Sequence, residues 1–241
     1  MTGARFPKNA ATVILLRPGE AGGLEVFLTR RPEGMDFLAG VYVFPGGTVT
    51  KEDCSEVLLK RCRGISPEEA RTILGAHLSP GLALGHWAAA IRELFEEVGV
   101  LLCVSGGGRP SDMTEKERKE RLLQKRQRLI EGAMTFGALL ESEGLCCDAS
   151  RLLYFSHWQT PEEFAIRFDT RFFLAALPFG QIPLERSEEV AHSLWVAPER
   201  ALQLSQDGKL PVIFPTFAAL RTLADFDSLE SLLAEYRKAP H

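Results

Sequence analysis

Three apolar segments near the N-terminus predict β-strands. Residues 10–18 form an almost unbroken apolar run, which is typical of a strand that is buried on both faces. Residues 24–30 follow a pair of glycines and favour a strand, so the two segments together predict a β-hairpin. A short stretch at 41–44 alternates aliphatic and aromatic residues and runs into a Pro-Gly-Gly turn at 45–47. Glycines in such a turn let the backbone approach a ligand closely.

A helical pattern follows at residues 91–100. Its apolar side chains take one face of a helix that Gly99 ends, while Glu93, Glu96 and Glu97 stand at i, i+3 and i+4 on another face. Three carboxylates this close repel one another unless something neutralises them. Hard oxygen ligands of this kind bind Mg²⁺ or Mn²⁺. The pattern alone leaves two interpretations, a solvated acidic face and a metal-binding cluster.

The rest of the chain predicts helical additions and a returning sheet. A capping box at Ser66 with a proline at the first helical position predicts a short helix over 67–74, and glycines and prolines interrupt the chain from 75 to 85. We expect a long charged helix over 114–131, whose lysines and arginines form a solvated face or meet substrate phosphates. Further strands are expected at 100–104, 152–158, 171–177 and 191–196, and further helices at 134–142, 198–204, 216–223 and 229–238.

Composition narrows the class of protein. The 241 residues are 45% hydrophobic and carry a formal net charge of −4, so we expect one α/β domain over residues 1–241. The absence of a long apolar run and of a signal-peptide region predicts a cytoplasmic protein with no membrane partner, and the acidic balance argues against a nucleic-acid partner. Five cysteines without a C-x-x-C pair predict reduced thiols, and five scattered histidines do not predict a histidine metal site.

The strand, the glycine turn and the acidic helix together resemble the Nudix box, G-x(5)-E-x(7)-R-E-U-x-E-E-x-G-U, where U is aliphatic. Residues 92–100 match every fixed position of its second half. If Gly47 is the glycine of the box, the first glutamate position falls on Asp53; if Gly46 is, it falls on Glu52. The register set by the preceding strand favours Asp53, whose carboxylate would then pair with Arg92.

The box of this chain contains an insertion. Arg92 lies 39 residues beyond Asp53 (92 − 53), where the Nudix pattern has 8, so about 31 residues are added. Loop closure entropy grows only logarithmically with length, so such an insertion is tolerable. We place it at about 54–85 and a second, helical insertion at about 111–144. The resemblance implies an α/β Nudix fold, an α/β/α sandwich with a mixed sheet and two helical insertions.

A narrower resemblance links the chain to the coenzyme A diphosphatase-like Nudix proteins that have a long insertion inside the box. Residues 27–47 keep every spacing of the signature L-L-T-K-R-S-x(3)-R-x(3)-G-x(3)-F-P-G-G, although Asp36 replaces the second arginine and Pro32 the serine. The segments 157–161 and 167–173 also resemble this subgroup. The implied reaction cleaves coenzyme A or its acyl esters to 3′,5′-ADP and a 4′-phosphopantetheine moiety, with Mg²⁺ or Mn²⁺ as cofactor.

The resemblance also implies roles for individual residues. Glu93 and Glu97 would be the primary metal ligands, with Glu96 and the carbonyl of Gly46 as further ligands, while Arg92 orients the cluster. Glu189 lies just before a predicted strand, where the family often supplies another carboxylate as ligand or general base. On the substrate side we assign Arg30, Arg31 and Phe44; for the two arginines, the alternative is a pair of exposed residues at a strand end.

Other functions stay open at this point. The partner we expect is a small-molecule diphosphate, and a homodimer is left open. A Nudix diphosphatase for a nucleotide sugar or a dinucleotide would fit the same box. A non-catalytic Nudix-fold binding module is the second alternative, and the complete set of glutamates counts against it.

Overall fold

The computed structural model describes residues 6–19, 22–35, 38–107 and 116–238. Within these ranges the main sheet has seven strands, in the order β10-β2-β1-β9-β8, with β3 paired to β2 and β4 to β1. β1 and β9 run parallel and the other pairs are antiparallel, so the sheet is mixed. The strands are β1 Lys8–Pro18, β2 Leu24–Arg30, β3 Tyr42–Val43, β4 Gly46–Thr48, β8 Leu153–Gln159, β9 Phe168–Ala176 and β10 His192–Val196.

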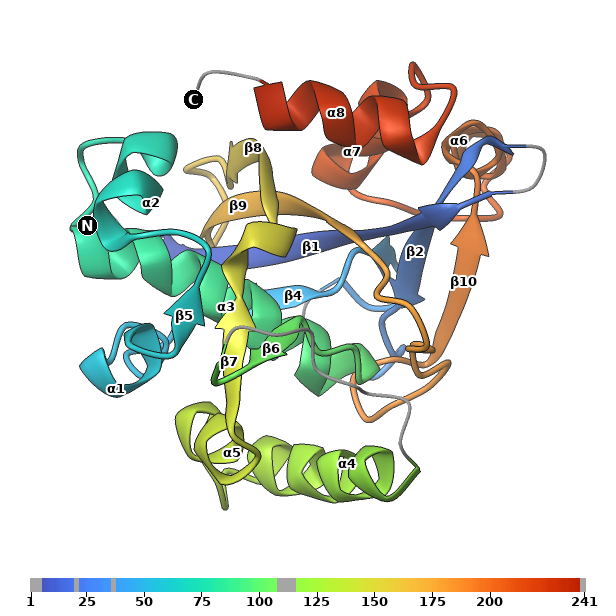
Figure 1. The fold of residues 1–241 in the computed structure, drawn as a ribbon. Helices are drawn as coiled ribbons and strands as arrows, with labels where there is room; N and C mark the ends of the chain where they lie inside the picture. Colours follow the sequence, from blue (N-terminus) through green and yellow to red (C-terminus); the bar gives the residue numbers. More distant parts are fainter. Residues whose placement is uncertain (1–5, 20–21, 36–37, 108–115, 239–241) are drawn as a thin grey trace.

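Helices cover both faces of this sheet (Figure 1). Because side chains alternate along a strand, Val13 and Leu15 of β1 enter the core with α3, whereas Ile14 and Leu16 enter the core on the other face. The second core is closed by α6, α7 and α8. The α/β/α sandwich predicted from the sequence is confirmed. The four helices are α3 Pro80–Val98, α6 Pro198–Gln206, α7 Phe214–Leu223 and α8 Leu229–Lys238.

The two insertions meet at a second, three-stranded sheet with the order β5-β7-β6. Its strand β5 comes from the insertion inside the box, and β7 directly follows the second insertion. Arg61 strengthens the junction, since its guanidinium donates to the Glu141 carboxylate at 3.0 Å. The elements are α1 Glu56–Leu59, β5 Cys62–Arg63, α2 Pro67–Leu74, β6 Cys103–Ser105, α4 Lys116–Ile130, α5 Phe136–Ser142, β7 Leu145–Asp148 and a 3₁₀ turn at Ala149–Arg151.

Several predicted bounds are confirmed, and one stretch was read wrongly. The capping box of α2 is present, and α3 ends at Gly99 with φ 72°. However, the interrupted stretch expected up to Gly85 becomes helical at Pro80, which is tolerated because it lies in the first helical turn behind the cap of Ser79. Gly85 lies inside the helix. A Cβ at this position would come within 2.5 Å of the Cys54 sulfur, which explains why the residue is a glycine.

Some sequence-based expectations concern other parts of the chain. Asp36 and the expected start of the charged helix at 114–115 lie outside the described residues. All five cysteines are free thiols, as predicted. None of the helices in the described ranges combines the length and the apolar character that crossing a membrane would require.

Candidate active site

Arg92 and Asp53 form the buried link between the insertion and the acidic helix. The Arg92 Nε and Nη2 atoms donate to the two Asp53 carboxylate oxygens at 2.8 and 2.9 Å, and Asp53 is fully buried. Nη2 also donates to the Thr48 carbonyl at 2.9 Å. This bidentate geometry uses the fixed fork of the guanidinium. The structure therefore assigns the first acidic position of the box to Asp53 rather than Glu52, which confirms the preferred register.

The same guanidinium also holds two glutamates of α3. The Nη1 atom of Arg92 lies 2.9 Å from Glu93 Oε1 and 2.8 Å from Glu96 Oε2. One buried cation is thus shared by three carboxylates, which restricts the rotamers of both glutamates. Arg92 thus contacts the acidic face directly, and the orienting role that the resemblance implies for it stays a prediction.

The two glycines of the turn allow β4 to pack closely on two sides, Gly46 against β1 and Gly47 against α3. The Gly46 N–H donates to Glu97 Oε2 at 3.3 Å. Because the N–H and C=O of one strand residue point to the same side, the Gly46 carbonyl also turns away from β1. A Cβ on Gly47 would come within 2.5 Å of the Glu93 carboxylate, so a side chain there would displace the glutamate. Gly47 is therefore required by the close approach to α3, and Gly46 by the close approach to β1, where a Cβ would collide with the Ala11 carbonyl oxygen.

The carboxylates at this contact carry more negative charge than their surroundings neutralise. Burial raises the pKa of Glu97 well above its ordinary value, and the charges of Glu93 and Glu189 raise it further. Burial likewise raises the pKa of Glu93 to about 7, against the lowering effect of Arg92. The pKa of Glu96 is raised as well, mainly by burial. Buried like charges of this kind are stabilised when a cation binds between them.

The loop before β10 brings Glu189 to the cluster from the other side. Its charge acts on both Glu96 and Glu97, although it is exposed and lies far from them in the sequence. The prediction that this position supplies a further carboxylate is consistent with that location. No strand or helix positions Glu189, so its orientation depends on the loop.

Arg126 is a residue of this region that the sequence reading missed. It was expected on a solvated face of α4, yet it is buried and donates to the carbonyls of Phe95 at 3.1 Å and Glu97 at 3.4 Å. It therefore satisfies the last carbonyls of α3, directly behind the acidic cluster. The signal was present in the pattern, because Leu122, Arg126 and Leu129 recur at helical spacing.

The three residues assigned to the substrate side are placed differently from one another. Arg31 lies close enough for its charge to act on Glu97. Arg30 donates to the Gly40 carbonyl at 3.1 Å and pairs with Glu33 at 2.5 Å, so it braces its own loop. Phe44 is 3% exposed and packs in the core on the α6 to α8 side of the sheet. That position corrects the assignment of Phe44, because a buried ring cannot contact substrate.

The acidic cluster has the donor chemistry of a divalent metal site. Within the described ranges, no three carboxylate, imidazole or thiolate side chains already converge as a metal site. Glu93 and Glu96 instead point to Arg92, and Glu97 points to the Gly46 N–H. The buried glutamate pair with raised pKa values still fits a cation, since hard oxygen donors with uncompensated charge suit Mg²⁺ or Mn²⁺.

Comparison with known proteins gives a consistent match. Residues 7–223 match the family model described as the NUDT19 Nudix domain. Two curated relatives are both named acyl-coenzyme A diphosphatase NUDT19. The protein from Gallus gallus is 30% identical over 243 residues, covering 86% of this chain and 63% of the relative. That from Homo sapiens is 28% identical over 246 residues, covering 90% and 64%. This chain thus spans less than two thirds of their length.

One solved structure agrees with the fold over almost the whole chain. It is a NUDIX hydrolase from Alicyclobacillus acidocaldarius, which superimposes with a TM-score of 0.78 at 27% sequence identity. The match covers 95% of this chain and 96% of that protein. The similarity therefore extends over the whole fold rather than over a part of it.

Proposed function

Since this chain belongs to the Nudix family through the NUDT19 Nudix domain, we propose that it is a diphosphatase acting on coenzyme A or acyl-coenzyme A. The products would be 3′,5′-ADP and 4′-phosphopantetheine or its acyl form. The proposal is supported by the relatives named acyl-coenzyme A diphosphatase and by the coenzyme A diphosphatase-like spacing of residues 27–47. It extends to this chain the activity for which these longer relatives are named.

The observation that carries the proposal is the buried pair of Glu93 and Glu97 against the glycine turn of β4. Burial raises the pKa of both groups, and the charge of Glu93 raises the pKa of Glu97 further, so the site favours a bound cation. A diphosphate carries negative charge that must be neutralised before water can attack phosphorus. A cation held by this pair would neutralise both the buried carboxylates and the diphosphate.

Individual residues have separate roles in the proposed reaction. Glu93, Glu97 and the Gly46 carbonyl would hold Mg²⁺ or Mn²⁺, with Glu96 as a further ligand. When bound, the metal supplies charge neutralisation at the diphosphate and a more acidic water. The Asp53 carboxylate fixes the position of Arg92, whose guanidinium contacts Glu93 and Glu96. Glu189 is exposed at the rim, where its carboxylate can accept a proton from the attacking water as general base.

A product analysis tests this function directly. The purified protein is incubated with coenzyme A, a nucleotide sugar or a dinucleotide, each with Mg²⁺ or Mn²⁺, and the products are separated by chromatography. Release of 3′,5′-ADP supports the proposal. Cleavage of only the nucleotide sugar or the dinucleotide would identify that compound as the substrate and would leave the proposed diphosphatase activity standing. No cleavage of any compound would favour a non-catalytic binding module.

Metal binding should stabilise the folded protein. A ligand that binds only the native state adds RT ln(1 + [L]/Kd), about 2.7 kcal/mol at a hundredfold excess over Kd, or roughly 5 °C or more in Tm for a chain of this size. Differential scanning fluorimetry in EDTA and in millimolar Mn²⁺ measures the shift. We expect Glu93→Gln to reduce the shift and the distant Glu230→Gln to keep it. Identical melting curves in EDTA and Mn²⁺ would contradict the proposal that the protein has a metal site.

The arginines before the turn should contribute to recognition of the 3′-phosphate. Arg31 carries positive charge within electrostatic reach of Glu97, and arginine suits a phosphate because its donors form a fixed fork. We expect coenzyme A to be turned over better than 3′-dephospho-coenzyme A, and Arg31→Ala to erode that preference by raising KM. Arg30→Ala should do so as well, less strongly because Arg30 is engaged with Glu33. Equal rates on both compounds for the unmodified protein would contradict the coenzyme A assignment.

A further inference from the structure

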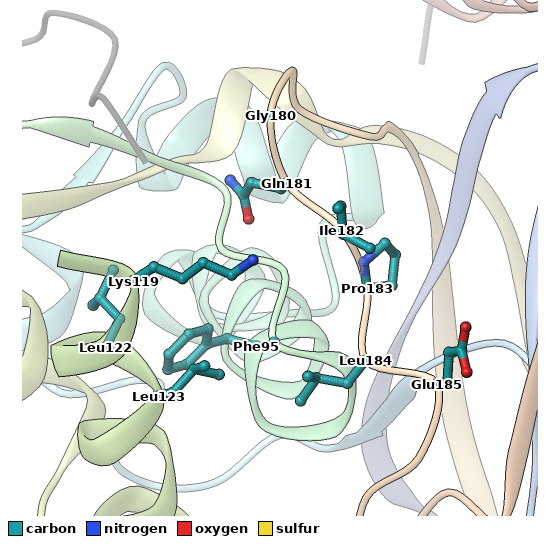
Figure 2. A pocket seen from close by; sticks show the side chains of 11 residues that line it. Phe95, Lys119, Leu122, Leu123, Gly180, Gln181, Ile182, Pro183, Leu184 and Glu185 are labelled. Atoms are coloured by element: carbon teal, nitrogen blue, oxygen red, sulfur yellow. The ribbon is translucent and has the colours of Figure 1, made fainter. Parts of the chain in front are cut away.

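A cavity of about 240 Å³ lies where the C-terminal end of α3, helix α4 and the loop 180–185 meet. Figure 2 shows its arrangement: the ring of Phe95 lies between Leu123 of α4 and Ile182 of the loop. The Lys119 side chain extends from α4 across Phe95, with its ammonium group directed toward the loop. The lining of the cavity is mostly apolar, with Lys119 as its cationic hydrogen-bond donor and Gln181 and Glu185 as its other polar side chains.

The loop that closes this cavity is held firmly. The Leu184 N–H donates to the Val98 carbonyl at 2.9 Å. The Gln181 amide exchanges two hydrogen bonds with the backbone of Leu101, at 2.9 and 2.8 Å. These bonds fix both ends of the loop to the chain that leaves α3. The cavity is therefore preformed, as small-molecule sites usually are.

Two elements connect the acidic cluster to the cavity. On α4, Arg126 donates to the carbonyl of Glu97, and Lys119 lies seven residues earlier, about 10 Å along the helix at 1.5 Å per residue. On the opposite side, Glu188 lies 3.8 Å from Arg126 Nη2, and the chain from there leads back to the loop that carries Ile182. The cavity and the cluster thus share the C-terminal end of α3, where Phe95 and Gly99 line the cavity next to Glu96 and Glu97 in the sequence.

The size of the cavity suits one arm of a substrate rather than a whole substrate. Its 240 Å³ is below the range of about 300–1,000 Å³ typical of pockets that enclose a complete drug-sized ligand. The pantetheine arm of coenzyme A has 13 chain atoms, which extend to roughly 15 Å at about 3.3–3.6 Å per three atoms. An arm of that length is longer than the roughly 10 Å of α4 that separate Arg126 from Lys119.

The apolar surface continues outside the cavity. On the same loop, Ile182 is 74% exposed and Phe179, next to the lining residue Gly180, is 99% exposed. Large apolar side chains that gather at the mouth of a cavity mark a binding surface, whereas a single one would need no explanation. A chain that fills the cavity would therefore find further apolar contacts as it grows longer.

We propose that this cavity is an acyl pocket, which binds the acyl end of the pantetheine arm of an acyl-coenzyme A. The Lys119 ammonium group donates to a carbonyl oxygen of the arm, at the thioester or at the neighbouring amide. This inference rests on the proposed function, because it assumes that the diphosphate binds at the acidic cluster. It assigns a binding site to the acyl group, the part of the substrate that would determine specificity among acyl-coenzyme A compounds.

Binding of compounds without a diphosphate tests the pocket apart from catalysis. Isothermal titration calorimetry with S-octanoyl-pantetheine and S-acetyl-pantetheine should give at least tenfold tighter binding of the octanoyl compound. Leu123→Trp, which fills the cavity, and Ile182→Glu, which places a carboxylate at its mouth, should remove the difference. Val57→Glu changes an exposed aliphatic residue of α1 and serves as the matched control. Equal affinities for the two compounds, or equally tight binding of octanoate, would overturn the acyl pocket.

Kinetics then relate the pocket to turnover. Each methylene that enters the cavity should raise kcat/KM by up to about fourfold. We expect Ile182→Glu to lower kcat/KM for octanoyl-coenzyme A at least tenfold relative to kcat/KM for coenzyme A, whereas the control Val57→Glu should leave both values within twofold of the unmodified protein. Equal losses on both compounds would contradict the inference. If neither is cleaved while octanoyl-pantetheine still binds in the cavity, the proposed function fails and the pocket stands.

Discussion

Glu97→Gln is expected to lower kcat by on the order of 10² or more, about 3 kcal/mol of transition-state stabilisation, without disrupting the fold. The substitution keeps the shape and the contact with the Gly46 N–H but removes the negative charge that a metal ion would bind. Steady-state kinetics on coenzyme A with Mn²⁺ measure the loss. Glu230→Gln, an exposed glutamate of α8, is the matched control and should keep normal turnover.

The same substitution should stabilise the metal-free protein at neutral pH. The raised pKa values of Glu97 and Glu93 mean that the folded state binds protons more tightly than the unfolded state. The stability contributed by protonation is therefore present below the ordinary carboxyl pKa and is lost as pH rises toward about 7, the value for Glu93. Melting in EDTA at pH 5 and pH 7.5 should show this loss, and Glu97→Gln should reduce it. Unchanged turnover combined with unchanged pH dependence would exclude Glu97 from the site.

Arg92→Ala is expected to destabilise the fold by about 3–5 kcal/mol and to abolish most activity, because it leaves the fully buried Asp53 carboxylate without its partner. Glu93 and Glu96 would also lose the cation that orients them. Urea unfolding gives the free energy of unfolding, and turnover of coenzyme A gives the activity. The loss of stability should appear with or without metal.

A double-mutant cycle separates the pair from its surroundings. Asp53→Asn alone should be nearly as destabilising as Arg92→Ala, and the two together should cost much less than the sum. Glu52→Gln changes the neighbouring carboxylate, which lies outside the Arg92–Asp53 pair, and should leave stability within about 0.5 kcal/mol. Additive effects of Arg92→Ala and Asp53→Asn would show that the bidentate pair does not couple the insertion to α3.

Local spacing was sufficient to predict the central part of the site. The glutamates of α3 share a face because of helical periodicity, and the glycines of the turn needed only the strand before them to fix their register. Asp53 could be chosen over Glu52 on the same ground, and the pair with Arg92 confirms it. The bounds of β2 and α8 also follow from composition and pattern in short windows.

Features that depend on partners distant in the sequence were missed. Strand β7 is only four residues long and carries two cysteines, so nothing local distinguishes it from a loop; it forms because β5 and β6 pair with it. The start of α3 was misread because Pro80 and Gly85 normally interrupt helices. Gly85 is required inside the helix because Cys54 from the insertion occupies the space that a side chain would fill.

The small sheet has a consequence for the design of a shorter version of this protein. Excising only the addition inside the box would remove β5 and expose the edge of β7, whose unpaired backbone groups could then recruit strands from other molecules. It would also leave Glu141 of α5 without Arg61. The two additions are therefore best regarded as one module, to be trimmed or transplanted together.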